Sequence, residues 1–287
     1  DHLGLRGGLG HAVGDKHRNY SELLTLQSPN GLARHLFIAD HQQDLHSTRG
    51  EVRLAYHKRT GKFAHGIFAG FRARDRLTES GGSDRRDFGT VVYGERDPET
   101  KPTFQFSRVN VGRLRQSALM LGYIARLDDV GSINVGIQKA RYRARFRDGL
   151  TGAVTLSRDD PWLYNATLAF QASRSLDFYA GMQKGLEDSG VAPDTARNRN
   201  EQLPATRTRQ YEGGVRFAIP GGRMVVNAFE ITKPYFSFDA TNAFTQVGKV
   251  RHRGLEASLA SHLGKRFSLL GGAVLMQPRV TGSARQL

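Results

Sequence analysis

Two stretches of the sequence carry arginine at every second position, and a third group lies between them. The residues are Arg72, Arg74 and Arg76, then Arg85, Arg86 and Arg96, and finally Arg141, Arg143, Arg145 and Arg147. Alternate residues of a β-strand share one face, so each run would form a row of guanidinium groups. Guanidinium binds carboxylate and phosphate through paired hydrogen bonds. For any single arginine a solvated strand extension is the simpler explanation, but the group as a whole predicts a basic field that attracts an anionic ligand.

The overall charge agrees with an anionic partner. The chain of 287 residues has 42 Lys and Arg against 27 Asp and Glu, a formal net charge of +15. Nucleic acid, lipopolysaccharide phosphates and an anionic ligand in a basic funnel would all fit such a surplus. The basic residues are spread along the chain rather than gathered in one tail, so charge alone leaves the three partners open.

Other residues that could do chemistry give weaker signals. No Ser, His and Asp fall at a spacing typical of a hydrolase. The absence of Cys excludes disulfides and Cys-based metal sites. His35, His41 and His46 lie near Asp40 and Asp44. Without a predicted helix to align them, a long loop explains these five residues better than a metal cluster.

The glycine-rich segment 7–14 approaches a dinucleotide-binding fingerprint. It lacks the required spacing and the helix that should follow, and glycines in a crowded β-strand explain it better. We therefore predict no catalytic residue, no metal site, no cofactor and no enzymatic activity.

The dominant pattern along the chain is apolar and polar residues alternating with period two, which indicates β-strands. It is clearest over 162–173, where apolar side chains from Trp162 to Phe170 share one face and the other face is mostly polar. The same pattern recurs over 50–57, 63–71, 132–138, 176–183, 211–217 and 255–260. Residues 139–147 and 223–232 have no clean phase, and we expect a bulge or an exit from a membrane there.

The connections carry more information than the strands. Short turns are predicted at 14–17, 59–61, 127–130, 173–175, 219–222 and 263–265, and long polar connections at about 29–47, 78–102, 147–160, 187–208 and 233–248. Short and long connections alternate strictly, as in a transmembrane barrel with short periplasmic turns and long extracellular loops. A soluble sandwich has no reason to keep every long loop at one end.

These patterns together predict an all-β fold, an antiparallel transmembrane β-barrel wall of about twelve strands. No stretch approaches the roughly 18 consecutive apolar residues of a transmembrane helix. Strands such as 103–126 look longer than the roughly 9–11 residues needed to span. The arginine runs would then line the upper lumen or the extracellular rim. We expect ligand contacts from Arg72, Arg74, Arg76, Arg85, Arg86, Arg141, Arg143 and Arg145.

Three segments support a more specific assignment. Residues 185–216 read GLEDSGVAPDTARNRNEQLPATRTRQYEGGVR, residues 226–239 read VNAFEITKPYFSFD, and residues 248–259 read GKVRHRGLEASL. In content, order and spacing they resemble strand and loop segments of TonB-dependent siderophore receptors. The resemblance implies a bacterial outer-membrane receptor that takes up a ferric siderophore or a similar anionic metal chelate, driven by the TonB complex.

The sequence also departs from the pattern of this family. Its members have about 22 strands around an N-terminal plug domain, and neither a plug nor a closing strand with a terminal aromatic residue is visible here. We therefore expect residues 1–287 to form a partial barrel domain without the plug, incomplete relative to a full 22-stranded barrel. The TonB complex would be contacted through the missing plug region. Outer-membrane lipid and lipopolysaccharide would be further partners, and nucleic acid would not.

Two other functions remain open from the residues alone. A passive porin or adhesin would have the same strands and loops without a plug. A soluble, basic, β-rich protein that binds nucleic acid would stay in solution without detergent and bind with a steep salt dependence.

Overall fold

The structure is a computed structural model, and it describes residues 2–16, 19–40, 43–95, 102–264 and 266–282. Within these ranges fifteen β-strands form and every pairing between them is antiparallel. The strands are β1 His2–Lys16, β2 Asn19–Leu26, β3 Leu32–Asp40, β4 Gln43–Thr60, β5 Phe63–Ser80, β6 Asp84–Val92, β7 Asn110–Leu127, β8 Gly131–Arg147, β9 Val154–Asp159, β10 Trp162–Ser173, β11 Leu176–Glu187, β12 Thr206–Ile219, β13 Gly222–Phe238, β14 Phe244–Leu263 and β15 Phe267–Thr281. The predicted all-β antiparallel fold is confirmed. Among the described residues no helix has the length and apolar character needed to cross a membrane.

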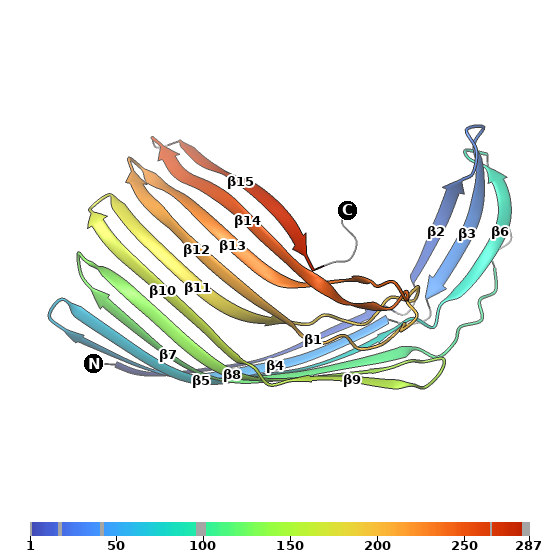
Figure 1. Ribbon diagram of the computed structural model, residues 1–287, viewed down its shortest axis with the longest axis horizontal. Coiled ribbons are helices and arrows are strands. Elements are labelled where there is room, and N and C mark those ends of the chain that lie inside the picture. The colour runs from blue at the N-terminus through green and yellow to red at the C-terminus, as the bar shows by residue number, and fades with distance from the viewer. Residues whose placement is uncertain (1, 17–18, 41–42, 96–101, 265, 283–287) are drawn as a thin grey trace.

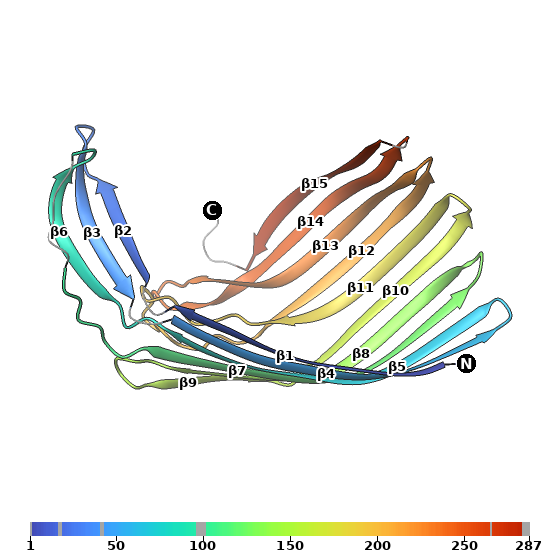
Figure 2. The same ribbon diagram turned by 180° about the vertical axis from the view of Figure 1, so that it is seen from behind.

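Twelve strands form one large sheet in the order β1-β4-β5-β7-β8-β10-β11-β12-β13-β14-β15, with the short β9 beside β8. The sheet curls into an open trough with β1 along one edge and β15 along the other (Figures 1 and 2). A separate three-stranded sheet, β2-β3-β6, projects beyond one end of the trough. The large sheet has the expected number of strands. In the described residues it does not close, because β1 and β15 each have one neighbour.

The predicted alternation of short and long connections is largely confirmed. The hairpins β4–β5, β7–β8, β10–β11, β12–β13 and β14–β15 all turn at one end of the trough, and the long connections and the small sheet lie at the other (Figure 1). The longest single connection without a strand of its own is the β11–β12 loop, residues 188–205. This segregation leaves one rim of the wall short and regular and the other built of loops.

Five predicted connections differ from the structure. Those expected at 78–102 and 147–160 contain the strands β6 and β9. The turn at 14–17 is not formed within the described residues, because β1 continues through Gly14 to Lys16. Most of the loop expected at 29–47 is strand and belongs to β3 and the start of β4. Its polar residues suggested a loop, although β3 pairs with β2 and β6. The loop expected at 233–248 shrinks to 239–243, since β13 and β14 stay paired up to Phe238 and Phe244. A register shift at Tyr235/Phe236 breaks the period-two pattern there and explains why the strand was not predicted.

The two segments without a clean phase contain no bulge. Residues 139–147 pair in unbroken register with β7, and residues 223–232 do so with β12 and β14. Their patterns look irregular because large or charged side chains occur on both faces. β7 begins at Asn110 rather than near 103, yet its 18 residues exceed the length needed to span a bilayer, as predicted.

The strand register assigns every wall residue to one of two faces. Directly paired residues of antiparallel strands point to the same side, and successive residues point to opposite sides. One face lines a cavity that reaches from β1 to β12, which only the interior of the trough can do. We call this the inner face and the opposite side the outer face. On β10, Asn165 and Thr167 belong to the inner face, and Leu168 and Phe170 belong to the outer face.

The outer face carries a continuous apolar band. Leu121, Leu168 and Leu119 are 54%, 57% and 64% exposed. Trp162 and Phe170 mark the two margins of the band on β10, eight residues or roughly 26 Å apart along the strand at ~3.3 Å per residue, which is about 18 Å in height for a strand tilted by ~45°. This height is of the order of the apolar band of outer-membrane barrels, which is about 25 Å tall between two girdles of aromatic residues. A soluble β-protein would not leave such a band uncovered.

The inner face is packed locally where strands approach closely. Phe68 of β5 lies over Gly122 of β7, where any Cβ would stand only 2.0 Å from the ring. The guanidinium of Arg53 in turn lies 5.6 Å from the centre of the Phe68 ring. Glycine at 122 therefore lets an aromatic ring and a cation stack against the wall instead of filling the lumen.

Candidate functional site

The first arginine run lies on the inner face of the wall. Arg72, Arg74 and Arg76 are on β5 at positions opposite in phase to the apolar residues of that strand, which face outward. The neighbouring strand β4 adds Arg49, directly opposite Arg74, and Glu51, directly opposite Arg72. Paired residues have Cβ atoms about 5 Å apart. β4 and β5 therefore hold the guanidinium groups of Arg49, Arg72 and Arg74 close together inside the trough, beside the carboxylate of Glu51.

These charges are unevenly neutralised. Arg72 donates a hydrogen bond to the side-chain oxygen of Gln138 at 2.9 Å, and Glu51 accepts one from Arg53 at 2.9 Å. Arg49 and Arg74 have no carboxylate partner among the residues that the structure describes. Like charges directly opposite each other destabilise a sheet. The pair would be relieved by an anion bound between the two guanidinium groups.

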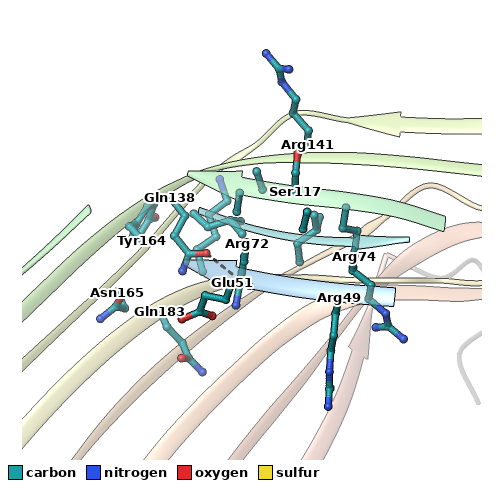
Figure 3. A pocket seen from close by; sticks show the side chains of 18 of the residues that line it. Arg49, Glu51, Arg72, Arg74, Ser117, Gln138, Arg141, Tyr164, Asn165 and Gln183 are labelled. Atoms are coloured by element: carbon teal, nitrogen blue, oxygen red, sulfur yellow. Dashed lines mark hydrogen bonds between the residues drawn. The ribbon is translucent and has the colours of Figure 1, made fainter. Parts of the chain in front are cut away.

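The cavity beside these arginines is lined by two kinds of surface. It has a volume of about 1030 Å³. Its polar lining includes Arg49, Arg72 and Arg74 on one side and Gln138, Asn165, Gln183, Gln210 and Glu212 on the other. Figure 3 shows Arg49, Arg74 and Gln183 on the same side of the sheet. The cavity thus combines a cationic wall with a row of amides that can both donate and accept hydrogen bonds.

The register of β10, β11 and β12 places three side-chain amides in one row. Asn165, Gln183 and Gln210 are directly opposite one another on β10, β11 and β12. The amide of Gln183 donates to the side-chain oxygen of Gln210 at 2.8 Å, and Gln210 donates to Glu212 at 3.2 Å. These bonds fix the direction of the amides of Gln183 and Gln210, so this part of the row offers preorganised polar contacts to a ligand.

Gly10 of β1 makes room for Arg49. The two residues are directly paired, and a Cβ at position 10 would stand 3.3 Å from Nε of Arg49. The contact would be with the far end of a flexible side chain, so a larger residue would displace the guanidinium rather than the backbone. The position of Arg49 in the cavity therefore depends on glycine at this point of β1.

Arg76 is held by a different network. Asp188, the first residue of the β11–β12 loop, forms an ion pair with Arg76 and accepts a hydrogen bond from the hydroxyl of Tyr142 at 2.7 Å. Tyr142 is completely buried and packs with Leu114 and Ala144. Arg76 therefore anchors the loop to the wall, and its charge is already compensated.

The same loop is tied to its neighbours at its far end. The side-chain amide of Asn200 donates to Asp148 at 2.6 Å, and the backbone N–H of Arg197 donates to the carbonyl of Asn242 at 2.8 Å. Hydrogen bonds from the backbone N–H of Thr151, and then from Asn200, lower the pKa of Asp148 to about 2. An ionised Asp148 thus joins the β8–β9 connection to the β11–β12 loop.

Of the other predicted arginines, Arg141 lies at the edge of this cavity, and the rest of those that the structure describes do not line it. Arg85 and Arg86 lie on β6 in the small sheet, where Arg86 pairs with Asp84 at 3.0 Å. Arg141, Arg143 and Arg145 share the phase of Ile137 on β8 and belong to the outer face. In Figure 3 the side chain of Arg141 points away from Arg49 and Arg74. Arg96 is outside the described residues.

The sequence analysis missed most of the polar lining of the cavity, including Arg49, Glu51 and Gln183. The polar phase of residues 51–57 and 177–183 was visible, but only closely spaced arginines were taken as a signal. Side chains that are isolated in the sequence become neighbours only through the pairing of β4 with β5 and of β10 with β11.

The predicted histidine and aspartate group does not assemble as a unit. His35 is buried in the small sheet and bonds Glu22 at 2.7 Å. His41 is outside the described residues. Asp44 and His46 lie instead with Asp15 on the outer face of β1 and β4, with their ligand atoms within 4.8 Å of one another. Exposed acidic groups often lie together without an ion, and we assign this group no role.

The alternation of faces, the apolar outer band and the polar inner cavity agree with comparisons to known proteins. Residues 3–282 match the model of the family described as TonB dependent receptor-like, beta-barrel. The chain belongs to this family. Its members are bacterial outer-membrane β-barrel proteins, and the localisation expected from the sequence is confirmed.

The similar proteins include receptors for ferric siderophores. The chain is 25% identical over 266 residues to the ferrichrome receptor FcuA of Yersinia enterocolitica, which covers 86% of this chain and 34% of that protein. Its fold is similar to BauA, the ferric preacinetobactin receptor of Acinetobacter baumannii, with a TM-score of 0.76 and 20% identity over 97% of this chain and 43% of the other. The FpvA protein of Pseudomonas aeruginosa, solved with bound ferric pyoverdine, gives a TM-score of 0.79 and 15% identity over 98% and 39%.

Each match covers most of this chain but only part of the other protein. The chain spans about a third of the length of the curated relative and less than half of each of these solved structures. The structural matches therefore concern a wall segment of the barrels, and they show the fold of that segment.

Proposed function

We propose that this chain is part of the barrel wall of a receptor that takes up an anionic ferric chelate of the siderophore class, with energy supplied by the TonB system. The observation that carries the proposal is the directly opposed pair Arg49 and Arg74, which lack a carboxylate partner in the described residues and lie beside a cavity of about 1030 Å³. Cavities of about 300–1,000 Å³ typically hold small ligands. The named relatives are receptors, and this supports a transporter and not an enzyme.

The relatives support the chemical class of the ligand. FcuA is named as a ferrichrome receptor and BauA as a ferric preacinetobactin receptor. Ferric siderophores present carbonyl, amide and oxyanion groups around the metal. The amide row would bind the first two and the arginine pair would bind an oxyanion.

We propose further that the whole receptor closes this wall into a barrel of about 22 strands around a plug, through which TonB would act. The open edges of β1 and β15 in the described sheet support this, because an unpaired edge in lipid leaves backbone groups unsatisfied. Outer-membrane lipid would cover the apolar outer band, and lipopolysaccharide would surround the rim on the side of the long connections.

The proposal is tested with the full-length receptor and a panel of ferric chelates that differ in charge. The double variant Arg49→Gln/Arg74→Gln removes both unpaired cations. A hydrogen bond to a charged group contributes about 1.5–3 kcal/mol, so losing two should weaken binding of an anionic chelate at least about a hundredfold. Dissociation constants are measured by fluorescence quenching, and uptake by radioactive iron in cells with and without TonB.

Arg223→Gln is the matched control, because Arg223 is an exposed inner-face arginine near the short turns. It should leave binding unchanged. If the double variant binds the anionic chelate as tightly as the wild type, the site is wrong. If the wild type binds none of the chelates, or takes them up without TonB, the proposed function is wrong.

A further inference from the structure

The second arginine run forms a patch on the outer face, away from the cavity. Strand register places Arg115 of β7, Arg143 of β8 and Arg158 of β9 directly opposite one another in a row. Arg113 is directly opposite Arg145 in the same way. We call the group Arg113, Arg115, Arg141, Arg143, Arg145 and Arg158 the outer arginine patch. Six guanidinium groups thus lie together on three adjacent strands of this face.

Only two carboxylates offset this charge. Asp75 accepts paired hydrogen bonds from Arg113, at 2.6 and 3.0 Å, and one from Arg115 at 3.1 Å. Asp160 accepts paired bonds from Arg143, at 2.9 and 3.0 Å. The remaining three arginines are Arg141, Arg145 and Arg158, which are exposed and have no carboxylate partner among the described residues. The patch therefore keeps an excess of positive charge and free hydrogen-bond donors.

The position of the patch along the strands places it near the membrane surface. Trp162, at the margin of the apolar band, is directly paired with Lys139, whose ammonium lies 5.3 Å from the centre of its ring. Arg141 and Arg145 are two and six residues further along β8, roughly 7 and 20 Å at ~3.3 Å per residue. Aromatic girdles lie at the level of lipid headgroups. The arginines therefore stand at and just beyond the plane where headgroup phosphates lie.

A depression joins the patch to the apolar band. It has a volume of about 740 Å³ and is lined by Leu9, Val52 and Phe71 on its apolar side. Its polar side includes Arg115, Arg141 and Arg143, and it is also bordered by Arg49, Glu51 and Arg74, which line the inner cavity as well. The small residues Gly50, Ala73 and Ser117 form its floor across β4, β5 and β7. One site thus offers an apolar surface and a cationic surface side by side, as an amphiphile requires.

The basic character is uneven along the outer face. At the same end, β1, β4 and β5 carry the acidic residues Asp15, Asp44 and Glu79. A second basic row, Lys184, Arg209, Arg251 and Arg279, lies on the strands toward β15, and there Glu230 forms ion pairs with Arg251 and Arg253. The acidic strands beside β7 disfavour an anion there, whereas β7, β8 and β9 favour one.

We propose that the outer arginine patch binds the phosphate groups of a phosphorylated lipid headgroup in the leaflet on the side of the long connections, with an acyl chain in the depression. The inference rests on the outer-membrane placement assumed in the proposed function, but not on chelate binding. Guanidinium and phosphate form paired, charge-assisted hydrogen bonds, and the directly opposed arginines become stable neighbours once an anion lies between them.

The experiment uses the purified full-length receptor in detergent and lipid A as the probe, in its bisphosphorylated and enzymatically dephosphorylated forms. The test variant is Arg141→Gln/Arg145→Gln/Arg158→Gln, which removes only exposed arginines without carboxylate partners. Binding is measured as bound lipid per receptor by native mass spectrometry across a titration. The triple variant should bind the bisphosphorylated form roughly ten- to a hundredfold more weakly, and the wild type should prefer it to the dephosphorylated form.

Lys58→Gln/Lys62→Gln/Arg174→Gln is the matched control, since these exposed basic residues lie near the short turns. Equal affinity of the two triple variants, or equal binding of both lipid forms by the wild type, overturns the inference. Competition by millimolar inorganic phosphate alone would identify a general anion site instead of a lipid site and also overturns it. Chelate binding by the same preparations separates this result from the proposed function, because a receptor that binds no chelate can still bind lipid A.

Discussion

The assignment of faces makes a direct prediction at Leu168 and Thr167, two successive residues of β10. Leu168 is on the outer face, opposite Ile133 and Ala180 on the neighbouring strands. Thr167 is on the inner face, opposite Asn134 and Gly181. Leu168→Arg should therefore place a charge in lipid, and Thr167→Arg should place the same charge in the polar lumen.

The magnitude follows from the position of Leu168 in the apolar band. It lies two residues from Ala166, the midpoint between Trp162 and Phe170, which is about 7 Å along the strand and about 5 Å in depth for a strand tilted by ~45°. Arginine on the lipid face costs about 2–4 kcal/mol at the midplane and about 0–1 kcal/mol near the interface. We expect about 2 kcal/mol for the charge and about 1 kcal/mol for the lost leucine, or roughly a hundredfold in the folding equilibrium. Thr167→Arg should stay within about 0.5–1 kcal/mol of the wild type.

The measurement is denaturant-induced unfolding of the full-length receptor from phosphatidylcholine vesicles, with the two variants and the wild type compared at equal lipid concentration. Heat-dependent mobility on gels confirms that each variant has folded before the titration. A larger loss for Thr167→Arg than for Leu168→Arg would show that the two faces are exchanged. Equal small losses would show that the apolar band does not contact lipid.

Three further predictions concern the cavity and the β11–β12 loop. Tyr142→Phe removes the hydrogen bond to Asp188 and should loosen the loop by about 1–2 kcal/mol, seen as faster trypsin cleavage there; unchanged cleavage would contradict the anchor. The carboxylate of Asp148 has a pKa of about 2, below its usual 3.8. Its stabilisation of the β11–β12 loop should therefore be complete above about pH 4 and be lost as the pH falls toward 2. Pepsin cleavage of the loop should rise over this range in the wild type, and Asp148→Ala should abolish that rise. Gly10→Val should displace Arg49 and weaken binding of an anionic chelate several-fold, and equal chelate affinity would exclude a role for this glycine.

The wall was predictable because its physics is local. In β10, the residues from Trp162 to Phe170 alternate cleanly, and a tight turn at 174–175 joins them to β11. Each such hairpin needs only adjacent residues to be recognised. β3 and β6 were taken for parts of long connections. They pair with each other, and β3 also with β2, beyond the wall, where no lipid selects an apolar face. Their polar residues therefore look like a loop in the sequence.

The site was predictable only in part. Arg72 and Arg74 were found from their spacing, but the partner of Arg74 comes from β4, and register across strands is not written in either segment alone. The same limit applies to Gln183, which meets Gln210 across two strands. Sequence patterns thus identify which side chains share a face, whereas strand pairing decides which of them meet.

The phase of neighbouring apolar residues separates two arginine runs that look identical. On β5 the arginines at 72, 74 and 76 alternate with Ile67, Ala69 and Phe71, which are in the opposite phase and face lipid, so these arginines must face inward. On β8 the arginines at 141, 143 and 145 continue the phase of Ile133 and Ile137 and must face outward. A shift of one residue would exchange the two faces of a strand. The same residue type at the same spacing is therefore directed to the inner face on one strand and to the outer face on another, and the apolar residues within each strand are sufficient to make that distinction.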